Sequence, residues 1–435
     1  MQKQFDAIII GAGVIGASIA LALARQGMKT LNVDELPAAG FGSTSNSSGV
    51  IRPFYSAVES CALAYEARHR WVDWPEFLGL QDERGLARYE ECGMLILLNE
   101  EDRQNFRPSL DAMKEVRVAF QHLTIEELRQ AFPVFEMTSF SPPMRIDDPG
   151  FGAGNGRTLT GGIFIPEAGY VSDPQLAAHN LQRAAESLGS VFKFNSRVEA
   201  IHKTSNRVSG VTTDKGERIK AAVVVNAAGP HSSKINALAG VSAEMQVSTR
   251  AERHEVAHVP APAGFADNPR ACVVGDGDVG VYFRPETGKN LVIGSLDPEC
   301  DARHPVDADD FNAELTEQWT NQIWRAALRM PMLTIPNTAR GVVGLYDTTP
   351  DWVPVYDKSA LPGFYMAIGT SGNQFKTAPV VGELMAELIV ECEAGRDHDT
   401  DPVSFRLPAL KRTINVGFFS RNRALHIGGT GSVLA

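Results

Sequence analysis

The stretch Asp6-Ala-Ile-Ile-Ile-Gly-Ala-Gly-Val-Ile-Gly16 decides the fold of this chain. Its apolar run Ala7–Ile10 is typical of a buried parallel strand. Gly11, Gly13 and Gly16 then form a tight turn into an apolar helix. These glycines let the backbone come close to a pyrophosphate, and the helix N-terminus offers that anion unpaired N–H groups and a partial positive charge. The stretch therefore predicts a nucleotide site.

The residues that follow complete a dinucleotide-binding pattern. Residues 31–33 predict a second strand, and Asp34 stands at its end, 23 positions after Gly11. A carboxylate at this place accepts hydrogen bonds from an adenosine ribose. Glycines alone are weak evidence, whereas strand, glycines, helix, strand and acid in register are specific. The alternative is an ordinary glycine-rich turn, which we disfavour because three glycines weaken a helix start unless something must approach it closely.

The composition of the 435 residues indicates a soluble, globular, intracellular protein of more than one domain. A net charge of −11 without any block of Lys and Arg argues against nucleic acid as a partner. The first strand is expected near residue 6, which leaves no room for a signal peptide, and no apolar run approaches the ~20 residues of a membrane span. We therefore expect a cytoplasmic protein with reduced thiols and no metal site. Its scattered cysteines are Cys61, Cys92, Cys272, Cys300 and Cys392.

The rest of the chain consists of predicted helices and strands separated by loops. A glycine- and hydroxyl-rich loop at 40–52 is followed by predicted helices at 59–78 and 100–118 and a predicted strand at 94–98. A six-glycine run at 150–162 precedes a helix at 175–188, and strands are expected at 191–194, 198–202, 209–213, 218–220 and 221–226. Strand-like pieces at 247–256, 271–274, 279–284 and 290–294 predict a mostly antiparallel sheet, with a helix at 311–328. A strand at 364–369, a loop at 370–377 and a helix at 378–392 repeat the strand–loop–helix pattern.

Three separated motifs resemble the D-amino acid oxidase family of flavoproteins, in its sarcosine oxidase, dimethylglycine dehydrogenase and glycine oxidase branch. They are the N-terminal stretch, Val224-Val-Asn-Ala-Ala-Gly-Pro230, and the pair Gly344-Leu-Tyr-Asp-Thr-Thr-Pro-Asp-Trp352 with Gly369-Thr-Ser-Gly-Asn-Gln-Phe-Lys376. Their order and spacing match the family from residue 5 to about residue 395. The resemblance implies FAD rather than NAD, and oxidation of an amine next to a carboxylate.

The resemblance also implies a fold and its division into domains. We expect an α/β fold with a Rossmann-like FAD-binding domain formed by residues 1–85, 150–230 and 335–400. Residues 86–149 and 231–334 would form an interleaved substrate-binding domain of the α+β class around an antiparallel sheet. Residues 401–435 would be a C-terminal tail, to which the sequence assigns no role.

Residue by residue, the family pattern implies a set of FAD contacts. It places the pyrophosphate at the first glycines, the ribose at Asp34, the adenine at the backbone of Val198, and the pyrimidine edge of the flavin at residues 372–376. The full set of expected cofactor residues is Gly11, Gly13, Val14, Ile15, Gly16, Asp34, Glu35, Gly42, Ser43, Thr44, Val198, Ala228, Gly229, Gly344, Leu345, Gly372, Asn373, Gln374, Phe375 and Lys376.

The same pattern implies a cationic clamp on the substrate carboxylate, formed by Arg52 and Lys376. Hydride leaves a carbon that bears a neutral amine, so the protein must orient that C–H bond rather than supply a strong base. A guanidinium binds a carboxylate bidentately and fixes this orientation. Tyr282 completes the candidate catalytic set from the antiparallel sheet. The alternatives are a structural role for Arg52 and a solvated Lys376.

Three departures from the family pattern bear on the flavin and on its reoxidation. Where some members attach the flavin through a cysteine, this chain has Gly344, and the loop at 40–52 has no histidine, so we expect FAD to be non-covalent. Where sarcosine oxidases have a lysine and a histidine that assist dioxygen, this chain has Val292 and Leu296. We therefore expect the reduced flavin to pass its electrons slowly to dioxygen, or to another electron acceptor.

The substrate is the least specified property. Arg250, Arg253, His254 and Arg284 could favour a second carboxylate, as in iminodiacetate, or pair with Glu252 and Glu255 as rim residues. We expect a sarcosine-, dimethylglycine- or iminodiacetate-like substrate. The alternatives are a primary D-amino acid or glycine dehydrogenase with a non-oxygen acceptor, and a flavin-binding subunit of a hetero-oligomeric oxidase. A homo-oligomer is equally compatible with the sequence.

Overall fold

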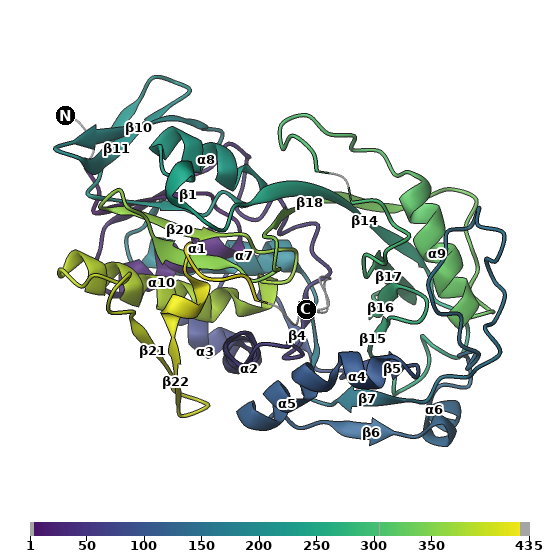
Figure 1. Ribbon diagram of the computed structural model, residues 1–435. Helices are drawn as coiled ribbons and strands as arrows, with labels where there is room; N and C mark the ends of the chain where they lie inside the picture. The colour runs from purple at the N-terminus through teal and green to yellow at the C-terminus, as the bar shows by residue number, and fades with distance from the viewer. Residues whose placement is uncertain (1–3, 304, 427–435) are drawn as a thin grey trace.

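A six-stranded sheet holds the N-terminal motif in the computed structural model, which describes residues 4–303 and 305–426 (Figure 1). The strand order is β19-β20-β13-β1-β2-β9, and all neighbours are parallel except the edge strand β19. The strands are β1 (Ala7–Ile10), β2 (Thr30–Val33), β9 (Val191–Lys193), β13 (Val223–Asn226), β19 (Val355–Lys358) and β20 (Phe364–Ile368).

Both faces of this sheet are covered, as expected for parallel strands. Ala7 and Ile9 pack toward α1 (Val14–Arg25), α7 (Pro174–Ser187) and α10 (Ala378–Glu393). Ile8 and Ile10 pack on the other side with the three-stranded sheet and helix α8. This second layer is made of β10 (Val198–Thr204), β11 (Arg207–Thr213), β12 (Arg218–Lys220) and α8 (Ser232–Ala239).

An eight-stranded sheet forms the other half of the molecule (Figure 1). Its order is β18-β14-β17-β16-β15-β5-β7-β6, antiparallel throughout except for the pair β15–β5. Helix α9 (Glu317–Arg329) packs on it. The strands are β5 (Met94–Leu98), β6 (Gln121–Leu123), β7 (Gly161–Ile165), β14 (Arg250–Pro260), β15 (Val273–Asp276), β16 (Val281–Glu286), β17 (Asn290–Ser295) and β18 (Gly341–Thr348). The mixed α/β class predicted from the sequence is confirmed.

Smaller elements connect or flank the two sheets. The strands β3 (Val50–Ile51), β8 (Gly169–Val171) and β4 (Tyr89–Glu90) form a short antiparallel sheet. The hairpin of β21 (Ser404–Leu407) and β22 (Arg412–Asn415) buries its apolar side chains in the core of the first half. The remaining helices are α2 (Val58–Val72), α3 (Trp74–Leu78), α4 (Asp102–Asn105), α5 (Arg107–Val116) and α6 (Ile125–Ala131).

Three predicted helices have other bounds, and each difference has a local cause. The predicted helix at 59–78 is broken between α2 and α3, because Pro75 has no N–H to continue it. Pro108 divides the predicted helix at 100–118 into α4 and α5 in the same way. The helix predicted at 311–328 begins only at Glu317, since the Glu255 carboxylate and the Thr316 side chain bind its first N–H groups.

The division of the chain into two domains stays a prediction. The sheets suggest a refinement of its boundaries, because β7 and β18 belong to the eight-stranded sheet although 150–230 and 335–400 were assigned to the FAD-binding domain. We propose that 161–165 and 341–348 count with the second domain. Within the described residues, no helix has the length and apolar character needed to cross a lipid bilayer.

A buried ion pair network fixes α9 to the eight-stranded sheet. Arg329 Nε lies 2.7 Å from Asp276 Oδ2, and its Nη2 lies 2.9 Å from Asp278 Oδ2. All three side chains are fully buried. Hydrogen bonds from Ser139 and the Phe140 N–H to Asp278 support the network. Loss of the Arg329 guanidinium would still leave uncompensated carboxylate charge in the interior.

We expect Arg329→Ala to lower the free energy of unfolding by about 3–5 kcal/mol, the usual cost of breaking a buried ion pair. Denaturant unfolding followed by intrinsic fluorescence measures it. Lys289→Ala is the control, because Lys289, in the turn between β16 and β17, forms an exposed pair with Asp267 in the loop between β14 and β15. A loss below about 1 kcal/mol for Arg329→Ala, as for a surface pair, would contradict this account.

Candidate cofactor and active site

The turn between β1 and α1 is packed as closely as the glycines predict. Gly11 has φ +112°, and a Cβ there would lie 2.2 Å from the carbonyl oxygen of Ala227 at the end of β13. A Cβ on Gly16 would lie 2.3 Å from the Gly11 carbonyl oxygen. Helix α1 begins after Gly13, which has no side chain to occupy this helix end, and its first turn has no acidic residue. This helix end therefore fits a pyrophosphate.

Asp34 is held at the same edge of the sheet. Its Oδ2 accepts a hydrogen bond of 2.6 Å from the Ala12 N–H, and its Oδ1 accepts one of 2.8 Å from the Leu36 N–H. Burial raises the pKa of this carboxyl against the lowering effect of these two bonds. Each oxygen keeps a second acceptor position, which fits the ribose hydroxyls expected there.

The hydroxyl-rich loop lies between α1 and β18. Thr44 Oγ1 accepts a hydrogen bond from the Val14 N–H at 3.1 Å, and Ser43 Oγ donates to the Leu345 carbonyl at 2.7 Å. A Cβ on Gly344 would lie 3.0 Å from the Cβ of Asn46. The structure thus brings together expected cofactor residues from three distant motifs: Gly13 to Gly16, Gly42 to Thr44, and Gly344 with Leu345.

The loop at 370–377 has a donor that fits a flavin edge. Asn373 Nδ2 is buried and has no hydrogen-bond partner among the described residues. Gln374 Oε1 instead accepts bonds from Tyr356 Oη at 3.2 Å and Thr377 Oγ1 at 2.8 Å. The Phe375 ring stacks on Trp71 with centroids 5.2 Å apart, so one face of Phe375 is engaged in the protein core. The Asn373 side-chain N–H group therefore remains available to a ligand.

Arg52 and Lys376 meet at a residue that the sequence did not single out, Tyr55. The Arg52 guanidinium carbon lies 4.7 Å from the Tyr55 ring centroid, and Lys376 Nζ lies 5.5 Å from it. Lys376 Nζ also donates to Tyr55 Oη at 3.2 Å and to the Asn373 carbonyl at 2.5 Å. Arg52 is 3% and Lys376 is 4% exposed. Two cations are thus buried around one tyrosine ring.

Burial shifts the pKa values of Lys376 and Tyr55. It lowers the pKa of Lys376 well below 10.5, and the nearby Arg52 lowers it further. It also raises the pKa of Tyr55 to about 12. Within the described residues, Lys376 forms no ion pair with a carboxylate at 4.0 Å or less. An anion in reach of Lys376 would therefore stabilise its charged form.

Tyr282 of β16 and Tyr346 of β18 lie on the same face of the eight-stranded sheet. Tyr282 Oη and Ser48 Oγ are 2.7 Å apart, and burial raises the pKa of both tyrosines. Glycines make room for both rings: a Cβ on Gly294 would lie 2.4 Å from Tyr282, and one on Gly372 would lie 2.3 Å from Tyr346. Tyr346 was missed as a site residue, although it lies within the quoted Gly344–Trp352 motif.

The other cations of this sheet are already paired. Arg250 lies 2.6 Å from Glu252, Arg253 lies 2.7 Å from Glu255, and Arg284 lies 2.9 Å from Glu286. His254 stacks on Tyr346 with centroids 3.8 Å apart, and burial lowers its pKa to about 4. The interpretation of these residues as rim and structural partners is therefore favoured over a second carboxylate site.

Comparison with known proteins places the chain in a family. The family model described as DAO, FAD dependent oxidoreductase, matches residues 6–388. The chain is 25% identical over 434 residues to FAD-dependent oxidoreductase domain-containing protein 1 of Bos taurus, with 89% of this chain and 82% of that protein covered. It is 23% identical over 397 residues to sarcosine oxidase subunit beta of Rhodobacter capsulatus, with 90% and 86% covered. Its structure resembles L-proline dehydrogenase from P. horikoshii with a TM-score of 0.75, 20% identity and coverage of 97% and 98%.

The chain therefore belongs to the DAO family of FAD-dependent oxidoreductases. This confirms the family, the enzyme class and the cofactor predicted from the sequence. The residues at the β1–α1 turn, at Asp34 and at Asn373 fit FAD by their geometry, and we keep the individual contacts as predictions.

We expect the flavin to be released completely by acid, because Gly344 offers no thiol and residues 40–52 offer no imidazole for a covalent bond. Precipitation of the yellow holoenzyme with trichloroacetic acid, followed by absorbance of the supernatant and the pellet, measures this. Flavin that stays with the washed pellet would show a covalent link and contradict the prediction.

Proposed function

We propose that the chain oxidises the C–N bond of a small secondary or N-substituted amino acid, of the sarcosine, dimethylglycine or iminodiacetate type. FAD, when bound, supplies the acceptor for the hydride that leaves the carbon next to the amine. The imine product is then hydrolysed by water. The single observation that carries the proposal is the burial of Arg52 and Lys376 around Tyr55 beside the loop at 370–377.

The two cations fit a carboxylate better than any neutral group. A buried ammonium or guanidinium is costly unless an anion or several hydrogen bonds compensate it. Lys376 donates to two neutral oxygens, which leaves one of its three N–H bonds for a ligand. A carboxylate held here would fix the position of its α-carbon, and Tyr282 and Tyr346 would border the amine from the opposite sheet. Orientation is the contribution that hydride transfer requires of the protein.

Two other functions stay open within the family. A primary D-amino acid or glycine would present the same carboxylate to Arg52 and Lys376. A flavin-binding subunit of a hetero-oligomer is suggested by the similarity to a protein named sarcosine oxidase subunit beta. We favour a secondary amine because the names of two similar proteins, sarcosine oxidase and L-proline dehydrogenase, both refer to secondary amino acids.

The acceptor and the cellular location complete the proposal. Val292 and Leu296 lie on the same face of the sheet as Tyr282, and both are apolar. Without a lysine at position 292 and a histidine at position 296, slow reoxidation by dioxygen and use of another acceptor are expected. The five cysteines are free thiols, which supports a cytoplasmic enzyme.

An anaerobic reduction screen tests the proposed function. The holoenzyme is mixed with sarcosine, dimethylglycine, iminodiacetate, glycine or D-alanine, and bleaching of the flavin is followed. Reduction by the N-substituted compounds supports the proposal, whereas reduction only by glycine or D-alanine assigns the primary substrate class. Reduction that appears only after a second subunit is added identifies the chain as part of a hetero-oligomer.

We expect Arg52→Ala to raise KM for the amino acid by at least ~100-fold, on the ~3 kcal/mol scale of a lost charge-assisted contact. Steady-state kinetics with saturating FAD measures it. Arg250→Ala is the matched control, since its side chain is 58% exposed and already paired with Glu252. An unchanged KM for Arg52→Ala would remove Arg52 from the substrate site.

The burial of Lys376 predicts the pH dependence of anion binding. Acetate binds to the protonated ammonium, and the lowered pKa means that the free protein loses this proton below pH 10.5. The affinity for acetate should therefore fall as pH rises through that lowered pKa, and Lys376→Met should abolish this pH-dependent fall. Perturbation of the flavin absorbance on titration with acetate measures it, and equal pH profiles for the two proteins would contradict the assignment.

A further inference from the structure

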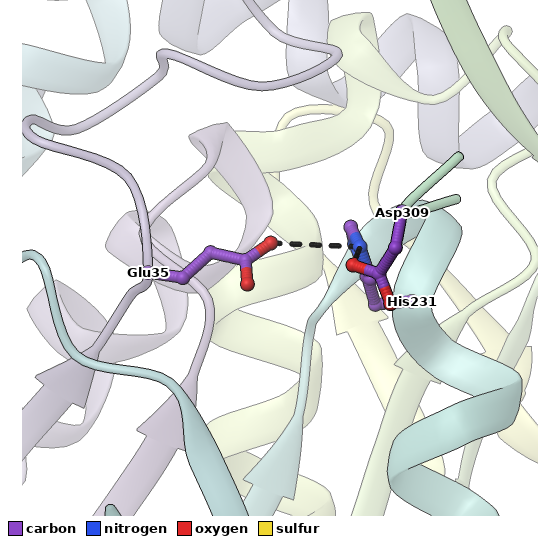
Figure 2. Close-up of side chains that lie close together, drawn as sticks. All are labelled: Glu35, His231 and Asp309. Atoms are coloured by element: carbon purple, nitrogen blue, oxygen red, sulfur yellow. Dashed lines mark hydrogen bonds and ion pairs between the residues drawn. The ribbon is translucent and has the colours of Figure 1, made fainter. Parts of the chain in front are cut away.

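An ion cluster outside the candidate active site links the two halves of the molecule (Figure 2). Asp309 lies in the segment 305–316 between β17 and α9. Its Oδ1 lies 2.9 Å from Arg197 Nη2 and 3.0 Å from His231 Nε2, and its Oδ2 lies 2.6 Å from Lys234 Nζ. Glu35 joins through Arg197 Nε at 2.7 Å and His231 Nε2 at 3.5 Å. Lys234 also pairs with Asp307. We call these six residues the Asp309 cluster.

The cluster adjoins Asp34 and Val198, the two residues expected to hold the adenosine half of FAD, and Gly229, a third residue expected to contact the cofactor. Glu35 directly follows Asp34, Arg197 directly precedes Val198, and His231 is two residues after Gly229. The segment that carries Asp309 belongs to the other half of the molecule, because the Val306 N–H donates to the Ala251 carbonyl of β14. A piece of the second half therefore lies across the ends of strands that the first half uses for adenosine.

The same side chains include the donors of a metal site, since Glu35, His231 and Asp309 can each offer one ligand atom to a shared ion. Their oxygens are already occupied by cations, however: Arg197 binds Glu35 and Asp309, and Lys234 binds Asp309 and Asp307. A divalent ion would have to displace two charged side chains. The carboxylates and cations of the cluster compensate each other's charge. The cluster is therefore an ion network and not a set of ligands available to a metal ion.

We infer that the Asp309 cluster is a clasp that closes over the adenosine end of bound FAD and slows its release. This inference rests on the proposed placement of adenosine at Asp34 and Val198. The side chains of Glu35, Arg197, His231, Lys234 and Asp309 are between 26% and 50% exposed. Exposed pairs are individually weak and are screened by salt, so the clasp can open without unfolding of either half.

The rate of FAD dissociation from the holoenzyme tests the clasp. Asp309→Asn keeps the shape of the side chain and removes its charge, and Asp267→Asn is the control from an exposed pair in the loop between β14 and β15. After dilution, the recovery of flavin fluorescence gives the rate. We expect Asp309→Asn to release FAD roughly five-fold faster than the wild type at low salt, which corresponds to the loss of a small ion network. Sodium chloride should accelerate release from the wild type more than from Asp309→Asn.

A second variant, Asp34→Ala, distinguishes a failure of the clasp hypothesis from a failure of the proposed adenosine placement. Asp34→Ala should weaken FAD binding at equilibrium. If it does and Asp309→Asn releases FAD at the wild-type rate, the clasp is overturned and the placement stands. If Asp34→Ala has no effect, the placement itself fails. Stabilisation of the wild-type apoprotein by zinc chloride, lost in His231→Ala, would show a metal site instead of a clasp.

Discussion

Two cations buried against one tyrosine set the character of the candidate active site. Arg52 comes from the end of the hydroxyl-rich loop, and Lys376 comes from the 3-10 turn Phe375–Thr377 directly before α10. Trp71 donates to the Lys376 carbonyl at 2.7 Å, and Tyr55 donates to the Asn373 carbonyl at 2.8 Å. Arg52 Nη1 donates to the Phe54 carbonyl, so both cations are held by the surrounding core. A charge held this rigidly in the interior favours a ligand of opposite charge and discriminates against ligands without one.

Each half of the fold contributes a different part of the candidate site. The parallel sheet brings the ends of β1, β2 and β13 to one edge, where Gly11 and Asp34 meet and where doubly wound folds bind their nucleotides. The antiparallel sheet presents Tyr282 from β16 and Tyr346 from β18, with β17 and β14 between these two strands. A substrate carboxylate at Arg52 would therefore be bordered by both halves, and the Asp309 cluster joins the same halves near Asp34 and Val198, where adenosine is expected.

Local patterns in the sequence predicted what depends on neighbouring residues. The β1–α1 turn, Asp34 and the strand–loop–helix around Lys376 follow from short motifs, and the structure brings them to one edge. Tyr55 was not predicted as a site residue because its partner Lys376 is 321 positions away, and no local pattern links the two. The breaks at Pro75 and Pro108 were visible in the sequence but were outweighed by helical periodicity. The edge strands β18 and β19 were missed because their pairing depends on distant partners.

The most direct test of the central claim compares one amino acid with its decarboxylated counterpart. Sarcosine and dimethylamine share the N-methyl group, and only sarcosine has the carboxylate that Arg52 and Lys376 would bind. Anaerobic rapid mixing with the holoenzyme gives the rate of flavin reduction for each. The account predicts that, at equal concentration, dimethylamine reduces the flavin at least ~100-fold more slowly, as expected for the loss of a charge-assisted anchor. Equal rates for the two compounds would contradict it.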